Sequence, residues 1–180
     1  MVKKILVSAM LASVIGAAHA TPVPYVGASV GVLTNTTSNA GNNQAGFYRG
    51  MPFNLFAGYG GVINQNIYLA GELTGTVGTG ELTARNSGAK STYGYGFSVI
   101  PGVMLSDRTL AFARAGVVRT RFTDVSSTAT GGQVGLGLQT SLTQSLDVRG
   151  EYDFTAYRSV SSVSAPRSDA ATVGLVYKFD

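Results

Sequence analysis

The chain has 180 residues, of which only 12% are charged, and it has no cysteine. Soluble proteins usually carry roughly twice that share of charge, so this composition argues against a surface that meets water on all sides. The formal net charge is +4, but the lysines and arginines do not cluster, which excludes the usual pattern of a nucleic-acid-binding protein. The 24 glycines also disfavour a mainly helical fold, because glycine destabilises helix interiors.

The first twenty residues have the three parts of a secretory signal peptide. Lys3 and Lys4 give a positive start, residues 5–17 are apolar, and Ala18-His19-Ala20 forms a small-x-small cleavage site. The apolar run is too short to cross ~30 Å of hydrocarbon as a helix. We therefore expect a cleaved signal peptide at residues 1–20 and one mature domain at residues 21–180. No later apolar run is long enough for a helical membrane span.

From residue 25 onward, apolar residues alternate with small or polar ones at a period of two, which predicts strands with one apolar face. In chain order, the predicted strands cover residues 25–33, 53–60, 67–74, 93–99, 109–121, 133–139, 146–154 and 172–179. The fifth is the least regular, because Leu110, Phe112 and Val118 share a face with Arg114. The sequence thus predicts eight strands.

The predicted connections alternate in length along the chain. The long ones cover residues 34–51, 78–92, 122–130 and 158–168, and the short ones cover residues 62–66, 105–109 and 142–145. Outer-membrane barrels have short periplasmic turns and longer extracellular loops. The pattern therefore predicts an all-β fold, an eight-stranded antiparallel transmembrane β-barrel with both ends on the periplasmic side.

The seventh strand indicates which face is inside. Asp147, Arg149, Glu151 and Asp153 share one face, and charged side chains there are unfavourable against lipid. They are expected to point into the lumen. A soluble, lipocalin-like exported barrel would have the charges outside, but the low charge content and the loop pattern argue against that alternative.

Three segments resemble a known family. Residues 68–72 (YLAGE), 97–116 (FSVIPGVMLSDRTLAFARAG) and 132–154 (GQVGLGLQTSLTQSLDVRGEYDF) are similar to the small opacity-type outer-membrane porin family, related to the membrane domain of outer membrane protein A. The resemblance implies an eight-stranded barrel with a side-chain-filled lumen, and eight strands leave little more room than that. It also implies recognition of the C-terminal strand by the barrel-assembly machinery, although Asp180 follows the expected terminal aromatic, Phe179.

Two details of the interior are predicted. Pro101 cannot donate to a strand ladder, so we expect it to mark a bulge. Counted from the short turns, Glu72, Arg114 and Glu151 lie at similar heights, with Arg149 one layer below. We therefore predict a lumenal ion-pair network centred on Arg114. Its members are Glu72, Arg114, Arg149, Glu151 and Asp153.

The sequence gives little support for catalysis. The only histidine, His19, lies in the predicted signal peptide, so the mature chain lacks the usual nucleophile pairs and zinc ligands. Glu151 and Asp153 could form a carboxylate pair, but neutralisation by the lumenal arginines explains them better. We expect no enzyme, no cofactor and no metal site.

The predicted function is that of a structural or weakly permeable, porin-like barrel in the bacterial outer membrane. A surface adhesin or ligand-binding barrel that acts through its extracellular loops is the alternative. The expected partners are outer-membrane lipid and lipopolysaccharide, and the protein is expected to be a monomer. Arg119 and Arg121 lie near the extracellular end of their strand, where they either contact lipopolysaccharide phosphates or are simply solvated.

Overall fold

The computed structural model describes residues 22–38, 45–85, 90–122, 127–158 and 164–179, so the predicted signal peptide and Asp180 lie outside the described residues. Eight strands make up nearly all of the described chain. They are β1 (Val23–Ser38), β2 (Ala45–Asn64), β3 (Ile67–Arg85), β4 (Ser91–Ser106), β5 (Thr109–Phe122), β6 (Ser127–Ser141), β7 (Leu146–Tyr157) and β8 (Ser164–Lys178). Among the described residues, no helix has the length and hydropathy to cross a membrane.

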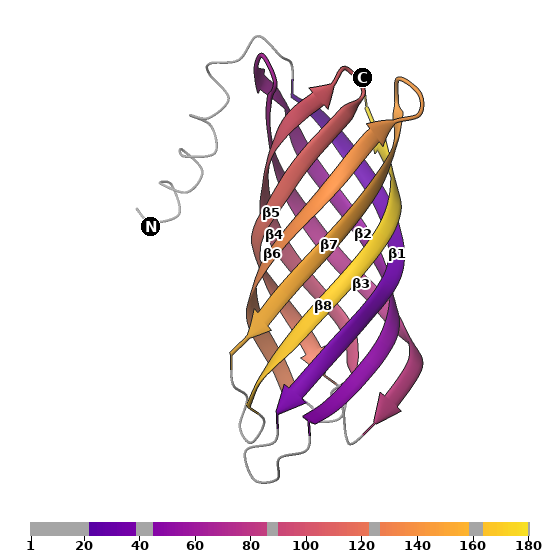
Figure 1. Cartoon of the computed structure of the whole chain (residues 1–180), viewed down its shortest axis with the longest axis vertical. Coiled ribbons are helices and arrows are strands. Elements are labelled where there is room, and N and C mark those ends of the chain that lie inside the picture. Colours follow the sequence, from indigo (N-terminus) through magenta and orange to yellow (C-terminus); the bar gives the residue numbers. More distant parts are fainter. Residues whose placement is uncertain (1–21, 39–44, 86–89, 123–126, 159–163, 180) are drawn as a thin grey trace, which may run out of the picture.

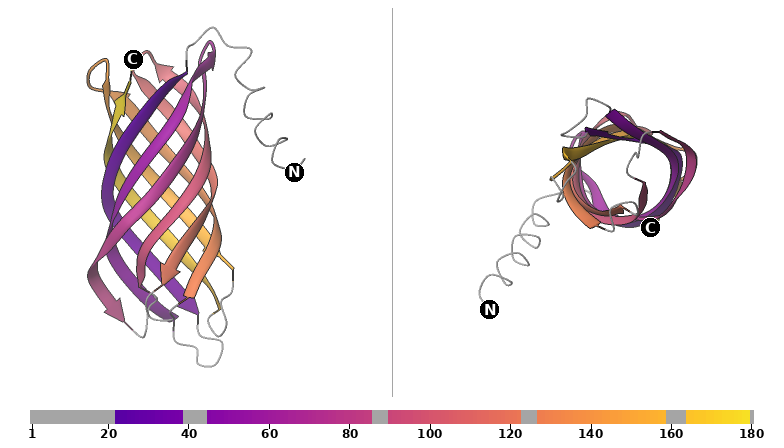
Figure 2. Two further views of the ribbon diagram at one scale, coloured as in Figure 1. Left: turned by 180° about the vertical axis from the view of Figure 1, so that it is seen from behind. Right: turned by 90° about the horizontal axis from the view of Figure 1, so that it is seen from below.

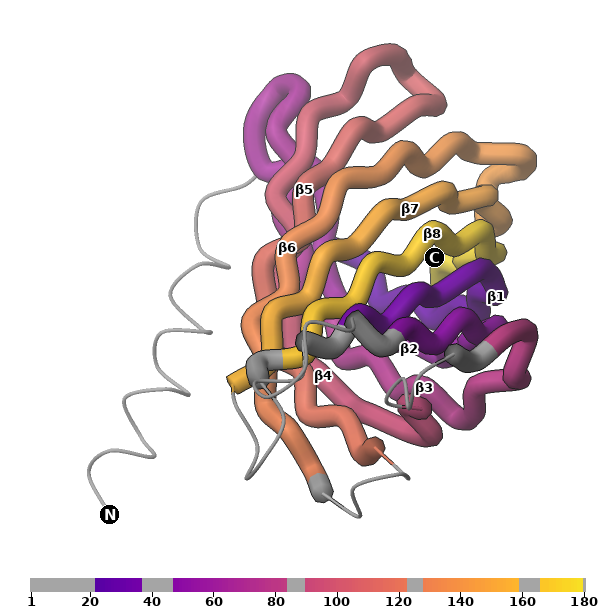
Figure 3. The backbone as a smooth tube through the Cα atoms, turned by 60° about the horizontal axis from the view of Figure 1, so that its bottom comes forward, coloured from indigo at the N-terminus to yellow at the C-terminus, as the bar shows by residue number. Residues whose placement is uncertain are grey.

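The strands form one closed antiparallel barrel in which neighbours in sequence are neighbours in space, and β8 pairs with β1 (Figure 1). The view along the axis shows the strands as a ring (Figure 2), and the backbone trace shows their order around it (Figure 3). The strands are strongly tilted. A path that starts at Val26 of β1 and steps from each residue to its partner on the next strand returns to β1 at Thr36, not at Val26. This offset is the stagger that goes with the tilt of the strands.

The two ends of the barrel differ. The short connections β2–β3, β4–β5 and β6–β7 lie at one end, together with Val23 and the C-terminal residues, and we call this the turn end (Figure 1). The strand ends next to the other four connections lie at the opposite end, which we call the loop end. By the usual rule for such barrels, the turn end faces the periplasm and the loop end faces the exterior.

The predicted apolar faces point outward. Leu136 is 70% exposed, Leu73 and Leu105 are each 64% exposed and Tyr95 is 62% exposed, whereas Glu72 and Arg149 are buried. A soluble barrel would bury the first group and expose the second. The arrangement is therefore that of a barrel whose outer wall meets hydrocarbon, and the soluble alternative is wrong.

The predicted boundaries of the long connections are wrong, because the strands extend far into them. Residues 34–38 and 45–51 belong to β1 and β2, and residues 78–85 belong to β3. These extensions are rich in Thr, Ser, Asn and Gly. Their inward Asn35 and Tyr48 are buried, but polar residues such as Thr36 and Arg49 occupy outward positions. The apolar alternation that marks a membrane strand therefore fades although the pairing continues.

Pro101 does not mark a bulge. The β4–β5 ladder pairs Val99 with Ala115 and Gly102 with Phe112, and it resumes after the skipped Ile100 and Pro101 in an unchanged register. Pro101 also pairs with Leu69 of β3 without a shift. The missing N–H therefore weakens only the ladder on the β5 side, and the strand accommodates the proline without an extra residue.

Candidate functional site: the barrel lumen

The lumen holds a compact ion-pair network near its middle, and it brings together the five residues predicted for it. Glu72 joins the two arginines, since its Oε1 accepts from Arg114 Nη2 at 2.6 Å and its Oε2 accepts from Arg149 Nη1 at 2.6 Å. Arg114 also forms a bidentate pair with Glu151, through Nε and through Nη2. Asp153 Oδ1 lies 3.6 Å from Arg114 Nε. Glu72 therefore shares the central position with Arg114.

Arg149 lies in a box of aromatic rings. Its Cζ is 4.8 Å from the ring centroid of Phe56, 5.1 Å from that of Phe112 and 5.5 Å from that of Tyr25. Cation–π attraction of this kind is stronger at desolvated sites than at exposed ones, and Arg149 is only 4% exposed. Tyr25 also donates its hydroxyl proton to Glu72 Oε2 at 2.9 Å, which connects the box to the network.

A chain of polar contacts leads from Arg149 toward the turn end. Arg149 Nε donates to Gln139 Oε1 at 2.8 Å, and Gln139 Nε2 donates to Asp147 Oδ2 at 2.6 Å. Lys178 Nζ lies 3.0 Å from Asp147 Oδ1. Lys178 therefore pairs with Asp147, and the cations of the central network are Arg114 and Arg149.

An apolar cluster fills the turn-end half of the lumen. Its buried members are Tyr25, Phe56, Ala70, Ile100, Leu110, Phe112 and Val176, with Tyr68 and Met104 packed against them. Glycines on neighbouring strands leave room for the rings. A Cβ at Gly137 would lie 2.3 Å from Phe112 Cζ, and a Cβ at Gly27 would lie 2.3 Å from Phe56 Cζ.

The network and this cluster divide the lumen into two cavities that share no lining residue. The turn-end cavity is lined by Tyr68, Met104, Asp147 and Lys178, among others. The loop-end cavity, which we call the vestibule, has Arg114, Glu151 and Asp153 at its floor.

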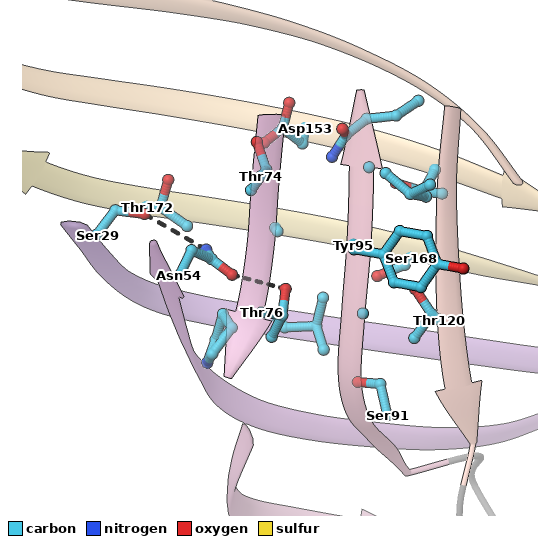
Figure 4. Close-up of a pocket in the computed structure, with 18 of the residues that line it drawn as sticks. Ser29, Asn54, Thr74, Thr76, Ser91, Tyr95, Thr120, Asp153, Ser168 and Thr172 are labelled. Carbon is cyan, nitrogen blue, oxygen red and sulfur yellow. Dashed lines mark hydrogen bonds between the residues drawn. The ribbon is translucent and has the colours of Figure 1, made fainter. Parts of the chain in front are cut away.

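Hydroxyl and amide groups line much of the vestibule wall (Figure 4). Thr76 Oγ1 donates to Asn54 Oδ1 at 2.8 Å, and Asn54 Nδ2 donates to Ser29 Oγ at 3.4 Å. Thr120 and Tyr157 are joined through their hydroxyl groups at 3.1 Å. The vestibule therefore offers a polar surface with both donors and acceptors.

The sequence interpretation missed the aromatic box and the apolar cluster. Leu110 and Phe112 share a face with Arg114, which we interpreted only as an irregularity of the fifth predicted strand. The signal was present, because Tyr25, Phe56 and Tyr68 also fall on the face opposite the lipid-facing residues of their strands. Large apolar residues at these inward positions predict a filled lumen rather than a water-filled one.

Arg119 and Arg121 lie on the outer face of β5 near the loop end, and both are exposed. Arg121 Nη1 donates to the hydroxyl of Tyr93 at 3.0 Å, and its Cζ lies 5.7 Å from the ring centroid of Tyr93. Arg119 pairs in register with Tyr95. Between β7 and β8, the outward Tyr152 donates to Asp169 Oδ1 at 2.9 Å. These contacts mark a belt where the apolar wall gives way to polar groups.

Among the residues that the structure describes, no group of three or more histidine, cysteine or acidic side chains is arranged to hold a metal ion.

A closed antiparallel barrel with an apolar wall, an interfacial tyrosine belt and a charged interior defines the class of transmembrane β-barrels. The family follows from the sequence. The chain belongs to the outer membrane protein beta-barrel domain family, whose model matches residues 5–179.

Two solved structures have a similar fold. Neisserial surface protein A (NspA) is 20% identical, with a TM-score of 0.57, over 87% of this chain and 97% of that one. Ail, the attachment invasion locus protein of Yersinia pestis, is 16% identical, with a TM-score of 0.50, over 87% of this chain and 99% of that one; it was solved in complex with the heparin analogue sucrose octasulfate. No curated protein sequence matches this chain.

Proposed function

We propose that this protein is a structural barrel of the outer membrane that does not conduct ions appreciably. The observation that carries the proposal is the division of the lumen, because the two cavities are separated by buried ion pairs and an apolar cluster. An ion that crossed this barrier would have to displace paired charges and pass through an apolar layer, where an unpaired charge is strongly unfavourable.

Single-channel recording in a planar bilayer tests this proposal. The wild-type barrel is expected to give no large, stable current steps. The variant F112A/R149A removes part of the apolar layer and one arginine of the network, so it is expected to conduct. Folding of both proteins is checked by their shift in gel mobility on heating. Large, stable steps from the wild type would refute a closed lumen.

A second candidate function is binding of an anionic partner at the loop end, as an adhesin or ligand-binding barrel. The supporting observation is the charge of that end, where basic residues outnumber acidic ones in the described chain. The basic residues are Arg49, Arg85, Lys90, Arg119, Arg121, Arg158 and Arg167, and the acidic ones are Glu81 and Asp169. The fold is shared with Ail, which binds a polysulfated sugar in its crystal structure.

Arg119 and Arg121 are the residues that we propose to contact lipopolysaccharide, because they combine exposure, the loop-end belt and a guanidinium suited to phosphate. The variant R119S/R121S is expected to associate less with lipopolysaccharide in a co-sedimentation assay while it keeps its heat-dependent gel shift. R108S is the control, since Arg108 is an exposed arginine at the turn end. If the wild type, R119S/R121S and R108S associate equally with lipopolysaccharide, Arg119 and Arg121 do not contact it and are simply solvated.

A further inference from the structure

The wall of the barrel opens between β3 and β4 near the loop end. The β3–β4 ladder ends at the pair Thr76 and Gly94, although both strands continue toward the loop end. Within the described ranges, residues 77–85 of β3 pair only with β2. Val77 and Leu82 are skipped in that ladder, and such bulges bend a strand. β3 therefore turns away from β4, and its end stands apart from the barrel wall in Figures 1 and 2.

The vestibule reaches the outer face at this opening. The side chains that line the vestibule come from lumen-facing positions, with two exceptions, Tyr93 and Tyr95 of β4 (Figure 4). Both tyrosines are outward residues, 47% and 62% exposed, that pair in register with Arg121 and Arg119. On the β3 side of the opening, a Cβ at Gly78 would have no atom within 4 Å. Because the two exceptions lie beside the unpaired part of β3, the vestibule connects with the outer surface there.

The outer rim of the opening is positively charged. It lies at the tyrosine belt, which is the depth of the lipid headgroups. Arg121 Nη1 donates to the hydroxyl of Tyr93 at 3.0 Å, and Arg119 lies on the same outer face of β5. Across the opening, Glu81 is paired with Lys90 at 3.2 Å, so that side adds no net charge. The rim therefore suits an anionic group such as a phosphate, for which arginine offers paired donors.

Behind the rim, the vestibule wall offers hydroxyl and amide groups. Thr76, Thr79 and Ser91 line it on the two strands that border the opening. The Oγ1 atom of Thr79 is buried and has no hydrogen-bond partner among the described residues. Sugar hydroxyl groups both donate and accept, so they match this wall. An acyl chain would leave its polar groups without partners, which is unfavourable.

We propose that the opening between β3 and β4 binds the phosphorylated sugar headgroup of an outer-leaflet glycolipid. The phosphate lies at the rim against Arg121 and Arg119, a sugar enters between the strands, and the acyl chains stay along the apolar wall. Glu151 and Asp153 at the vestibule floor repel a phosphate, which keeps it at the rim. The inference rests on the proposed contact of the two arginines with lipopolysaccharide and adds the place where the sugar binds.

The variant G78W tests the opening in the lipopolysaccharide co-sedimentation assay. Gly78 pairs with the outward Phe53, so a tryptophan there covers the opening from outside. Association is expected to fall about tenfold, as for the loss of one or two hydrogen bonds. G132W is the matched control, because a Cβ at Gly132 also has no atom within 4 Å, but Gly132 is paired on both sides, with Val117 and Ala156. G132W is expected to associate like the wild type, and the heat-dependent gel shift shows that both variants fold.

The two proposals fail in different ways in this assay. Equal association of G78W and G132W, with a loss in R119S/R121S, would refute the opening as a site and keep the arginine contact. A loss in G78W alone would keep the opening and remove the arginines from the site. Equal association of all these variants with the wild type would refute both proposals.

NMR of the mature protein in phosphatidylcholine nanodiscs shows whether the sugar enters the vestibule. Lipopolysaccharide is expected to shift the side-chain amide signals of Asn54, which lines the vestibule, but not those of Gln139, which lines the turn-end cavity. An unshifted Asn54 would mean that the headgroup stays outside, and the proposal would be wrong. Glucose 1-phosphate, which has no acyl chains, is expected to bind at least about tenfold more weakly. Equal affinity for both would show a site for soluble sugar phosphates and overturn the choice of a lipid.

Discussion

Replacing Glu72 with glutamine is expected to lower the free energy of unfolding by about 3–5 kcal/mol, the range for breaking a buried ion pair by removing one partner. Glu72 is 1% exposed and accepts from Arg114, Arg149 and Tyr25. Arg114 keeps Glu151 after the change, but Arg149 loses its one ion pair within the described chain. The loss therefore comes mainly from a stranded guanidinium group in the aromatic box.

Urea-induced unfolding in lipid vesicles, followed by circular dichroism, measures this effect. E81Q is the matched control, because Glu81 also pairs with a cation but its side chain is 49% exposed. Exposed pairs contribute only about 0–1 kcal/mol, so E81Q is expected to be nearly as stable as the wild type. Similar stabilities of E72Q and E81Q would mean that the lumenal network does not stabilise the barrel.

Replacing Gly31 with alanine is expected to impair closure of the barrel. Gly31 lies on the inner face of β1, and a Cβ there would be 1.9 Å from the carbonyl oxygen of Ala171 and 2.6 Å from the Cα of Thr172. Both atoms belong to the backbone of β8, so they cannot move aside without disturbing the β1–β8 ladder. We expect a loss at or above the upper end of the ~1–3 kcal/mol that overpacking usually costs.

Gly150→Ala is the matched control for Gly31→Ala. No atom would lie within 4 Å of a Cβ at Gly150, which is on the outer face of β7. Alanine also restricts the unfolded chain, so G150A is expected to be as stable as the wild type or up to about 1 kcal/mol more stable. The heat-dependent gel shift after refolding gives the folded fraction of each variant. Equal folded fractions for G31A and G150A would show that the strands can separate locally.

The sequence predicted the parts of the fold that depend on alternation across the membrane. Lipid permits only apolar side chains on one face, so the orientations of Leu73, Tyr95 and Leu136 could be read directly. The ion-pair network could also be placed, because Glu72, Arg114 and Glu151 lie at equal distances from the short turns that set the register.

The remaining features could not be predicted because other physical constraints determine them. The extensions of β1 and β2 have polar residues such as Thr36 and Arg49 at outward positions, so they lack the apolar alternation of a lipid-facing strand. The effect of Pro101 depends on which neighbouring strand its nitrogen faces. The box around Arg149 depends on the barrel's stagger, which brings Tyr25, Phe56 and Phe112 from three strands to one point. No local pattern in the sequence contains that stagger.

The pairing of β1 with β8 has a consequence for how the chain folds. Tyr25 pairs with Lys178, so the contacts that complete the ring join opposite ends of the chain and carry the largest entropy of loop closure. Until they form, β1 and the last paired strand each present a row of unsatisfied backbone groups. Hydrocarbon cannot hydrate such groups. A partly built sheet therefore cannot wait inside the bilayer unassisted, and the strands must either enter together or have their free edges covered by another protein until the ring is complete.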